Sequence, residues 1–147
     1  MSNSPALSPA AAKSLQKWHD MMKQLDFSEL ESIVADDAVF RSPVANTPYP
    51  GKKVVCIVLR GAAGVFKDFV YHRELYDDEN SVCLEFEARV GDKTLKGIDL
   101  VKFNAEGKIV AFEVMVRPLT GVMALGEAMK ASVGPAIKAA LEERASA

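Results

Sequence analysis

Cysteine and histidine are scarce in this chain of 147 residues, and their scarcity narrows the possible chemistry. The two cysteines, Cys56 and Cys83, show no C-x-x-C spacing, so each is expected to pack as a small apolar residue. The two histidines, His19 and His72, form no H-x-x-H or H-E-x-x-H pattern, which argues against a transition-metal site. We therefore expect neither a metal ion nor any other cofactor.

Motifs for phosphate and acyl chemistry are also missing. There is no glycine-rich dinucleotide motif, no P-loop and no G-x-S-x-G, so nucleotide-binding and serine-hydrolase functions have no support. Acidic residues (20) slightly outnumber lysine and arginine (18), and the formal net charge is -2. Nucleic acid and anionic membrane surfaces both require a basic protein surface, so neither is an expected partner.

Long apolar segments are absent as well. No apolar run approaches the roughly 18 residues that a membrane-spanning helix needs. The N-terminal stretch "MSNSPALSPAAAKS" lacks the basic region and the long apolar region of a secretion signal, which predicts a cytoplasmic location. What is present is an ordinary globular composition, 49% hydrophobic and 26% charged. A chain of this length fits one domain over residues 1–147, with residues 1–7 as a flexible tail.

The first half of the chain carries helical signals. Ser8 followed by Pro9 marks the start of a helix that runs to about Leu25. Apolar residues recur along it at helical spacing, at Leu15, Trp18, Met22 and Leu25. Further predicted elements are a short helix over 28–34 opened by a capping box, a short strand over 38–44, a proline-rich loop over 45–51 and a helix over 52–69.

The second half reads as a series of strands closed by one helix. Turn residues separate four strands, predicted over 70–77, 81–90, 94–104 and 108–117. Residues 120–145 then form an amphipathic helix with a break at Gly134 and Pro135. Helices followed by an antiparallel meander are typical of an α+β domain with its helices packed on one sheet face.

One acid stands out in the strand "LKGIDLVKF", residues 95–103. Side chains alternate across a strand, so Asp99 shares a face with Leu95, Gly97, Val101 and Phe103. Lys96 and Lys102 indicate that the opposite face is at least partly exposed to solvent. Asp99 is therefore the only charged residue on the apolar face. Burial disfavours the charged form of a carboxyl and raises its pKa, and a neutral acid can donate a hydrogen bond to a substrate oxygen.

Two interpretations of Asp99 follow from this position. In the first, Asp99 is a core residue that accepts a hydrogen bond from a buried donor, Trp18 or Tyr71. In the second, Asp99 faces a ligand. In the second case the indole N–H of Trp18, which is only a donor, could converge with Asp99 on one oxygen-binding site.

Two segments make the chain recognisable. "ADDAVFRSPVANTPYPGKKVV" (35–55) and "GIDLVKFNAEGKIV" (97–110) resemble the ketosteroid-isomerase and SnoaL-like branch of the NTF2-like superfamily. The order of elements matches over about residues 8–118. The resemblance implies a cone of helices on a curved antiparallel sheet that encloses a pocket, usually in a dimer. Because this superfamily hosts isomerases, cyclases, epoxide hydrolases and binding modules, the resemblance does not fix the substrate.

The resemblance also implies roles for individual residues. Asp99 falls on the acid that serves the isomerases as a protonated oxyanion donor, and Trp18 falls on their tyrosine donor. Ser42 falls where those enzymes place an aspartate general base. A serine hydroxyl by itself is no useful base for a carbon-bound proton, so the full steroid-isomerase mechanism is not expected. His72, if its strand face points inward, is the candidate replacement base.

The remaining expectations concern the pocket walls and the assembly. Inward-facing Phe86, Val101 and Val116 are expected to contact substrate. Tyr49, in the proline-rich loop, either closes the pocket mouth and contacts substrate or packs within the loop. The sheet's outer face mixes charged and apolar residues, which predicts a homodimer. Three hypotheses remain open: a cofactor-free isomerase, cyclase or hydratase acting on a small apolar oxygenated compound, a binding module without chemistry, and a protein-interaction domain.

Overall fold

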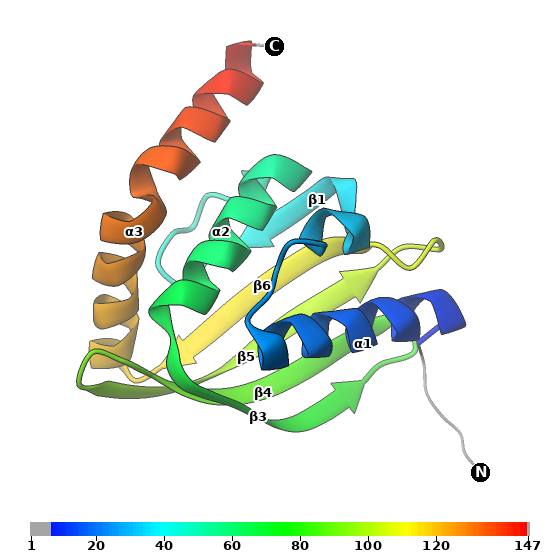
Figure 1. Cartoon of the computed structure of the whole chain (residues 1–147), viewed down its shortest axis with the longest axis horizontal. Coiled ribbons are helices and arrows are strands. Elements are labelled where there is room, and N and C mark those ends of the chain that lie inside the picture. The colour runs from blue at the N-terminus through cyan, green and yellow to red at the C-terminus, as the bar shows by residue number, and fades with distance from the viewer. Residues whose placement is uncertain (1–6, 147) are drawn as a thin grey trace.

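The computed structural model describes residues 7–146 and contains three α-helices, a short 3-10 helix and six strands (Figure 1). In chain order these are α1 (Pro9–Gln24), the 3-10 helix η1 (Leu30–Ile33), β1 (Val34–Arg41), β2 (Tyr49–Pro50), α2 (Lys52–Val65), β3 (Lys67–Tyr76), β4 (Ser81–Val90), β5 (Lys93–Phe103), β6 (Ile109–Arg117) and α3 (Leu119–Ser146). None of the helices within 7–146 combines the length and the apolar character needed to cross a membrane.

The strands form one mixed sheet in the order β2-β1-β6-β5-β4-β3. Neighbours along β3 to β6 are antiparallel, as the sequence predicts, and so are β1 and β2. The β1–β6 pair is parallel, which the predicted antiparallel sheet does not include. These two strands are far apart in the sequence, so no tight hairpin fixes their relative direction. Figure 1 shows the three helices on one side of the curved sheet, which confirms the predicted α+β arrangement.

Several predicted boundaries are confirmed and others are wrong. Strand β4 has the predicted bounds, and α1 begins at Pro9 after a Ser8 cap whose side chain accepts a hydrogen bond from the Ala11 N–H. The predicted helix over 28–34 is a single 3-10 turn, because Val34 already belongs to β1. Helix α2 ends at Val65 rather than 69, since β3 starts at Lys67 and pairs with β4.

The C-terminal helix continues through the predicted break. Pro135 lies inside α3, and Figure 1 shows the helix changing direction about halfway along its length. A proline removes one helical hydrogen bond and tends to kink the helix. Packing on α2 continues on both sides of the kink, with Gly61 of α2 against Val133 and Lys53 of α2 paired with Glu143. This packing explains why the helix bends instead of ending.

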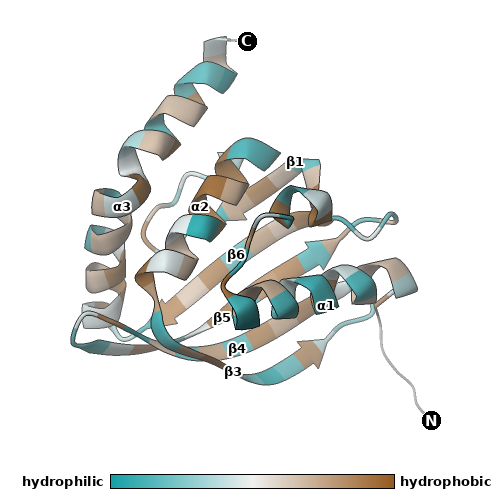
Figure 2. Cartoon of the chain, in the orientation of Figure 1, coloured by the Kyte–Doolittle hydropathy of each residue, from teal (hydrophilic) through white to brown (hydrophobic). Residues whose placement is uncertain are grey.

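Of the predicted flexible tail, residues 1–6 lie outside the described residues. Leu7 is partly buried and packs against the main apolar cluster. That cluster joins α1, η1, α2 and the sheet, and a second one lies beneath the start of α3. In Figure 2, apolar and polar residues alternate along the strands, as a sheet with one buried face requires.

Gly97 allows an unusually close approach in the centre of the sheet. A Cβ at this position would lie 2.4 Å from the carbonyl oxygen of Met115 and 2.7 Å from Cζ of Phe86. The missing side chain therefore lets the Phe86 ring lie directly against β5. Two residues further along β5, Asp99 pairs with Leu84 on one side and Val114 on the other.

Candidate functional site

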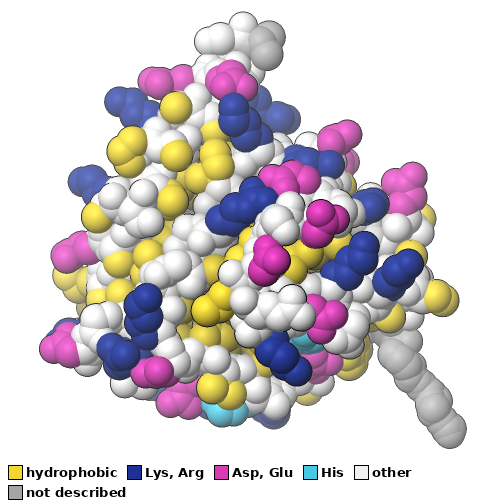
Figure 3. Space-filling view, viewed as in Figure 1, with side chains coloured by type: hydrophobic (Ala, Val, Ile, Leu, Met, Phe, Trp, Pro, Cys, Tyr) yellow, Lys and Arg dark blue, Asp and Glu magenta, His cyan; other side chains and the backbone are white. Residues whose placement is uncertain are grey.

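A cavity of about 410 Å³ lies between the helices and the inner face of the sheet. Its walls are mainly apolar and carry five aromatic rings, those of Trp18, Phe40, Phe66, Phe69 and Phe112, in addition to Tyr49. Figure 3 shows hydrophobic side chains reaching the surface between α2 and α3, the two helices that form one wall. A cavity of this size and composition is typical of sites for small apolar molecules.

Asp99 lines this cavity, and its side chain is almost completely buried, at 5% exposure. Its Oδ2 accepts a hydrogen bond of 2.6 Å from the Tyr71 hydroxyl, whereas Oδ1 has no hydrogen-bond partner within residues 7–146. Burial raises the pKa of Asp99 to about 7, against the opposing effect of the Tyr71 hydrogen bond. The sequence-based placement of Asp99 on the inner face is confirmed.

Trp18 also lines the cavity, but its indole is already engaged. Its Nε1–H donates to the Tyr71 hydroxyl at 2.9 Å, and its ring packs against Phe27 and Phe112 with centroids 5.9 and 5.4 Å away. The predicted convergence of two free donors, Trp18 and Asp99, is therefore wrong. An indole has a single N–H, and Tyr71 receives it. Tyr71 accepts a hydrogen bond from Trp18 and donates one to Asp99, so the core interpretation holds with Tyr71, not Trp18, as the donor to the acid.

His72 does not line the cavity, so the structure gives no support to its predicted role as a pocket base. The pairing of β3 with β4 shifts between Tyr71 and Arg73, where two residues of β3 oppose one of β4. Up to this bulge β3 alternates regularly, with Phe69 and Tyr71 half-buried and His72 exposed, where it pairs with Glu87 at 3.2 Å. Alternation separates Tyr71 from His72, but it does not show which of the two strand faces is the inner one. Tyr71 could therefore be named from the sequence only as a possible partner of Asp99.

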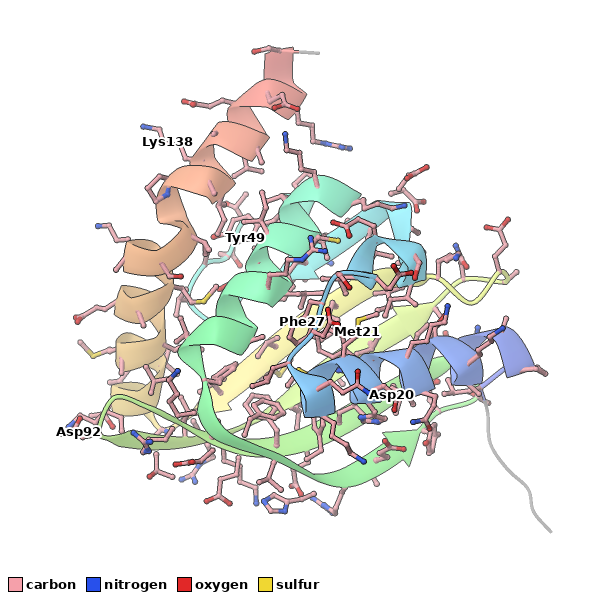
Figure 4. All side chains as sticks on the ribbon, in the orientation of Figure 1. Asp20, Met21, Phe27, Tyr49, Asp92 and Lys138 are labelled. Carbon is pink, nitrogen blue, oxygen red and sulfur yellow. The ribbon has the colours of Figure 1, made fainter. Side chains whose placement is uncertain are left out.

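Ser42 and Tyr49 both line the cavity, as expected from the sequence. The Ser42 hydroxyl oxygen accepts a hydrogen bond of 3.1 Å from the Val44 N–H, which fixes the turn after β1. Tyr49, labelled in Figure 4, stacks on Phe40 with ring centroids 6.4 Å apart. Apart from Asp99, the charged residues of the lining come from exposed positions on α3: Lys130, Lys138 and Glu142. Figure 4 shows Lys138 pointing away from α2.

Three residues predicted to contact substrate do not line the cavity. Phe86, Val101 and Val116 lie on the inner face or in the core, yet none lines the cavity. Phe86 is fully buried because the rings of Phe66 and Phe69 cover it, at centroid distances of 5.6 and 4.9 Å. The cavity is lined by those covering rings and by Val114. Strand phase predicts the inner face, but it does not predict which side chains lie on top of others.

Both cysteine thiols are free and at least half-buried, and residues 7–146 contain no cluster suited to a metal ion. Cys56 is buried, and burial raises the pKa of its thiol to about 11, which makes it a poor nucleophile. Cys83 is half-buried, and its pKa is raised as well, chiefly by burial. Within residues 7–146, no group of three or more histidine, cysteine and acidic side chains is arranged to hold a metal ion.

Comparison with known proteins gives a consistent result. The model of the SnoaL-like domain matches residues 15–112, more than half of the chain. A steroid delta-isomerase structure from Pseudomonas aeruginosa is 46% identical, with a TM-score of 0.87 over 92% of this chain and 99% of that one. A Silicibacter pomeroyi protein with a cystatin-like fold is 32% identical, with a TM-score of 0.76 over 82% of this chain and 84% of that one. No curated protein matches the chain.

More distant structures share the fold alone. An NTF2-like protein of unknown function from Mesorhizobium loti is 14% identical, with a TM-score of 0.68 over 80% of this chain and 98% of that one. Three helices on a curved mixed sheet, together with these likenesses, define an NTF2-like α+β fold. Within that class the chain belongs to the SnoaL-like family, because the family model covers most of its sequence.

Proposed function

We propose that the cavity binds a small, largely apolar compound with an oxygen function, and that the chain catalyses an isomerase-type reaction on it. The observation that carries this proposal is that Asp99 lines an apolar cavity while its buried Oδ1 has no hydrogen-bond partner within residues 7–146. Leaving a buried polar atom unpaired costs free energy, and a ligand hydroxyl or carbonyl would remove that cost. The 46% identity to a protein described as a steroid delta-isomerase supports the reaction class.

In this proposal Asp99 is the catalytic residue that touches the substrate oxygen. Near neutral pH a large share of its carboxyl is protonated, because its pKa is raised to about 7. The protonated form donates a hydrogen bond to an oxygen on which negative charge develops. The hydroxyls of Ser42 and Tyr49 line the same cavity and help to orient the substrate. Trp18 acts through Tyr71 rather than on the substrate.

A base for a carbon-bound proton is the missing part of a steroid-isomerase site. Of the two cavity hydroxyls, Ser42 occupies the position at which the resemblance implies an aspartate, and a hydroxyl is a poor base near neutral pH. This position favours a second candidate function, a ligand-binding module on the same cavity without chemistry. Both functions involve the same class of ligand, but only the enzyme converts it to a product.

Ligand binding to the native state is expected to raise the melting temperature. Hydrophobic ketones and alcohols that fit the cavity should do so in a concentration-dependent manner in a thermal-shift assay. A compound present at 100 times its Kd should stabilise the protein by about 2.7 kcal/mol. Oxygen-free hydrocarbons of matched shape are the control, and they should bind more weakly because they leave Asp99 unpaired. An equal shift with the hydrocarbons would argue against a role of Asp99 in recognition.

We also propose that the protein is a homodimer that associates through the outer face of the sheet. This face presents a mixture of charged and apolar residues on β4 to β6: Glu85, Glu87, Ile98, Leu100, Met115 and Arg117. Met115 is 48% exposed in the single chain, a large apolar side chain that an interface would cover.

Sedimentation at micromolar concentration is expected to give twice the chain mass of 15.9 kDa. Met115→Glu should shift the mass toward the monomer, because it places a charge in the proposed interface. Met123→Glu is the matched control, since Met123 is similarly exposed at 57% but lies on α3, on the other side of the sheet. A monomer mass for the unmodified chain would refute the dimer.

A further inference from the structure

The hydrogen bonds that join Trp18, Tyr71 and Asp99 have a fixed direction. The indole Nε1–H can only donate, so the Tyr71 oxygen accepts from it at 2.9 Å. The Tyr71 hydroxyl proton then goes to Oδ2 of Asp99 at 2.6 Å. Oδ2 is therefore an acceptor in this chain of bonds. A proton on the Asp99 carboxyl consequently resides on Oδ1.

The Tyr71 ring is held from several sides, so its hydroxyl has little freedom to turn elsewhere. His19 and Phe69 contact it edge to face, with centroids 5.3 and 4.8 Å away and interplanar angles of 81° and 84°. Phe86 makes a third perpendicular contact at 6.4 Å. Tyr71 pairs with the fully buried Phe86 of β4, which places its ring on the inner face of the sheet. Burial raises the pKa of Tyr71 well above its ordinary value, with the Asp99 charge adding to the effect, so its hydroxyl keeps the proton near neutral pH.

We infer that Tyr71, oriented by the Trp18 N–H, is a positioning residue that keeps the Asp99 proton on Oδ1, the oxygen left to the cavity. This inference rests on the proposed function in treating Asp99 as the group that meets the ligand. It assigns Trp18 a different role from the one the family resemblance implies. Trp18 contributes to the site by orienting Tyr71 and touches no substrate oxygen.

The other titratable groups around this chain of bonds belong to α1, β3 and β4. His19 on α1 lies against the Tyr71 ring and pairs with Glu74 on β3, which also accepts a hydrogen bond from the Tyr76 hydroxyl. The Cys83 thiol on β4 has a pKa raised in part by the Asp99 charge. None of these groups is hydrogen-bonded to Asp99. Tyr71 is thus the one hydrogen-bond donor to this carboxyl within residues 7–146.

The test is an NMR titration of the Asp99 carboxyl carbon in the ligand-free protein, for the unmodified chain, Tyr71→Phe, Trp18→Phe and the double variant. Loss of the Tyr71 donor should move the midpoint of the Asp99 titration upward by about one to two pH units. Trp18→Phe should move it upward by less, because it only weakens Tyr71 as a donor. In the Tyr71→Phe background, Trp18→Phe should have no further effect. Tyr76→Phe is the control, and it should leave the midpoint unchanged.

Two results would overturn the inference. One is an unchanged Asp99 midpoint in Tyr71→Phe, and the other is an additive effect of the two substitutions, which would make Trp18 independent of Tyr71. If Tyr71→Phe does not fold, Trp18→Phe alone tests the inference. A small upward shift of the Asp99 titration midpoint in this variant would support it, and an unchanged midpoint would overturn it. Because the readout needs neither ligand nor turnover, failure to find a ligand would count against the proposed function alone.

Discussion

Asp99→Asn is expected to make the protein more stable above pH 7 while lowering its proposed activity. The carboxyl is buried at 5% exposure, and its pKa rises from an ordinary value of 3.8 to about 7 because burial disfavours the charge. The amide is nearly isosteric and neutral at every pH. It can accept the Tyr71 hydrogen bond through its oxygen and present its NH₂ to the cavity, so the fold should be preserved.

The direction of the stability effect follows from the raised pKa. Between pH 4 and 7 the folded protein holds the Asp99 proton and the unfolded chain does not, so this carboxyl loses its contribution to stability as the pH rises. The contribution is complete below about pH 4 and absent above about pH 7. At about 1.36 kcal/mol for each pH unit, the total loss is of the order of 4 kcal/mol.

The measurement is denaturant unfolding of both proteins from pH 4 to 8.5. The difference in unfolding free energy should be small at pH 4 and should grow to a few kcal/mol in favour of the variant above pH 7. Comparing the two proteins at each pH cancels the contributions of all other titrating groups. A difference that does not change with pH would mean that the Asp99 carboxyl titrates at its ordinary pKa.

The same substitution should slow catalysis, because an amide is a weaker hydrogen-bond donor than a carboxylic acid. Removing one donor to a developing oxyanion typically costs about 10²–10³-fold in kcat, and an amide should retain part of that contribution. The activity of the unmodified protein should also fall as the pH rises through about 7, while that of the variant stays level. A rise of activity through pH 7 would instead make Asp99 a base.

Much of the fold could be predicted from the sequence because its signals are local. Flanking turn residues predicted the bounds of β4, alternation predicted the inward direction of Asp99, and the Ser8-Pro9 pair predicted the start of α1. The parallel β1–β6 pair could not be predicted in this way, since it joins segments more than 60 residues apart. The continuation of α3 past Pro135 depends likewise on packing against α2.

The site could be predicted only in part, for a similar reason. Asp99, Ser42 and Tyr49 line the cavity, whereas His72 lies exposed on the other face of β3. Periodicity puts Tyr71 and His72 on opposite faces of this strand, but the mixed composition of both faces does not show which one is inward. The position of the Tyr71 hydroxyl between Trp18 and Asp99 depends on how α1 packs on the sheet, which no strand pattern contains.

Ser42→Asp is expected to produce a large gain of steroid-isomerase activity from a low starting level. The reaction removes a proton from carbon next to a carbonyl, so it requires a base as well as a donor to the substrate oxygen. In the proposed site Asp99 is the donor, and the position that the resemblance assigns to the base holds Ser42. General-base catalysis typically contributes about 10²–10⁴-fold, and the variant should gain an increase within that range.

The local structure is suited to this substitution. The Ser42 oxygen accepts a hydrogen bond from the Val44 N–H, and an aspartate at the same position can accept it with one carboxylate oxygen. The second oxygen is then available to the cavity that Ser42 lines. Ser42→Asn is the matched control, because it can form the same turn without being a base and should gain no activity.

Turnover of a Δ5-3-ketosteroid, followed by ultraviolet absorbance, provides the measurement, with thermal shift as an independent record of binding. Adding Asp99→Asn to Ser42→Asp should remove part of the gain, because base and donor act on the same transition state. Rapid isomerisation by the unmodified chain would show that another group already serves as the base. If the steroid binds to Ser42→Asp without any gain in turnover, position 42 does not reach the reacting carbon, and the assignment of Asp99 as the oxyanion donor loses its main support.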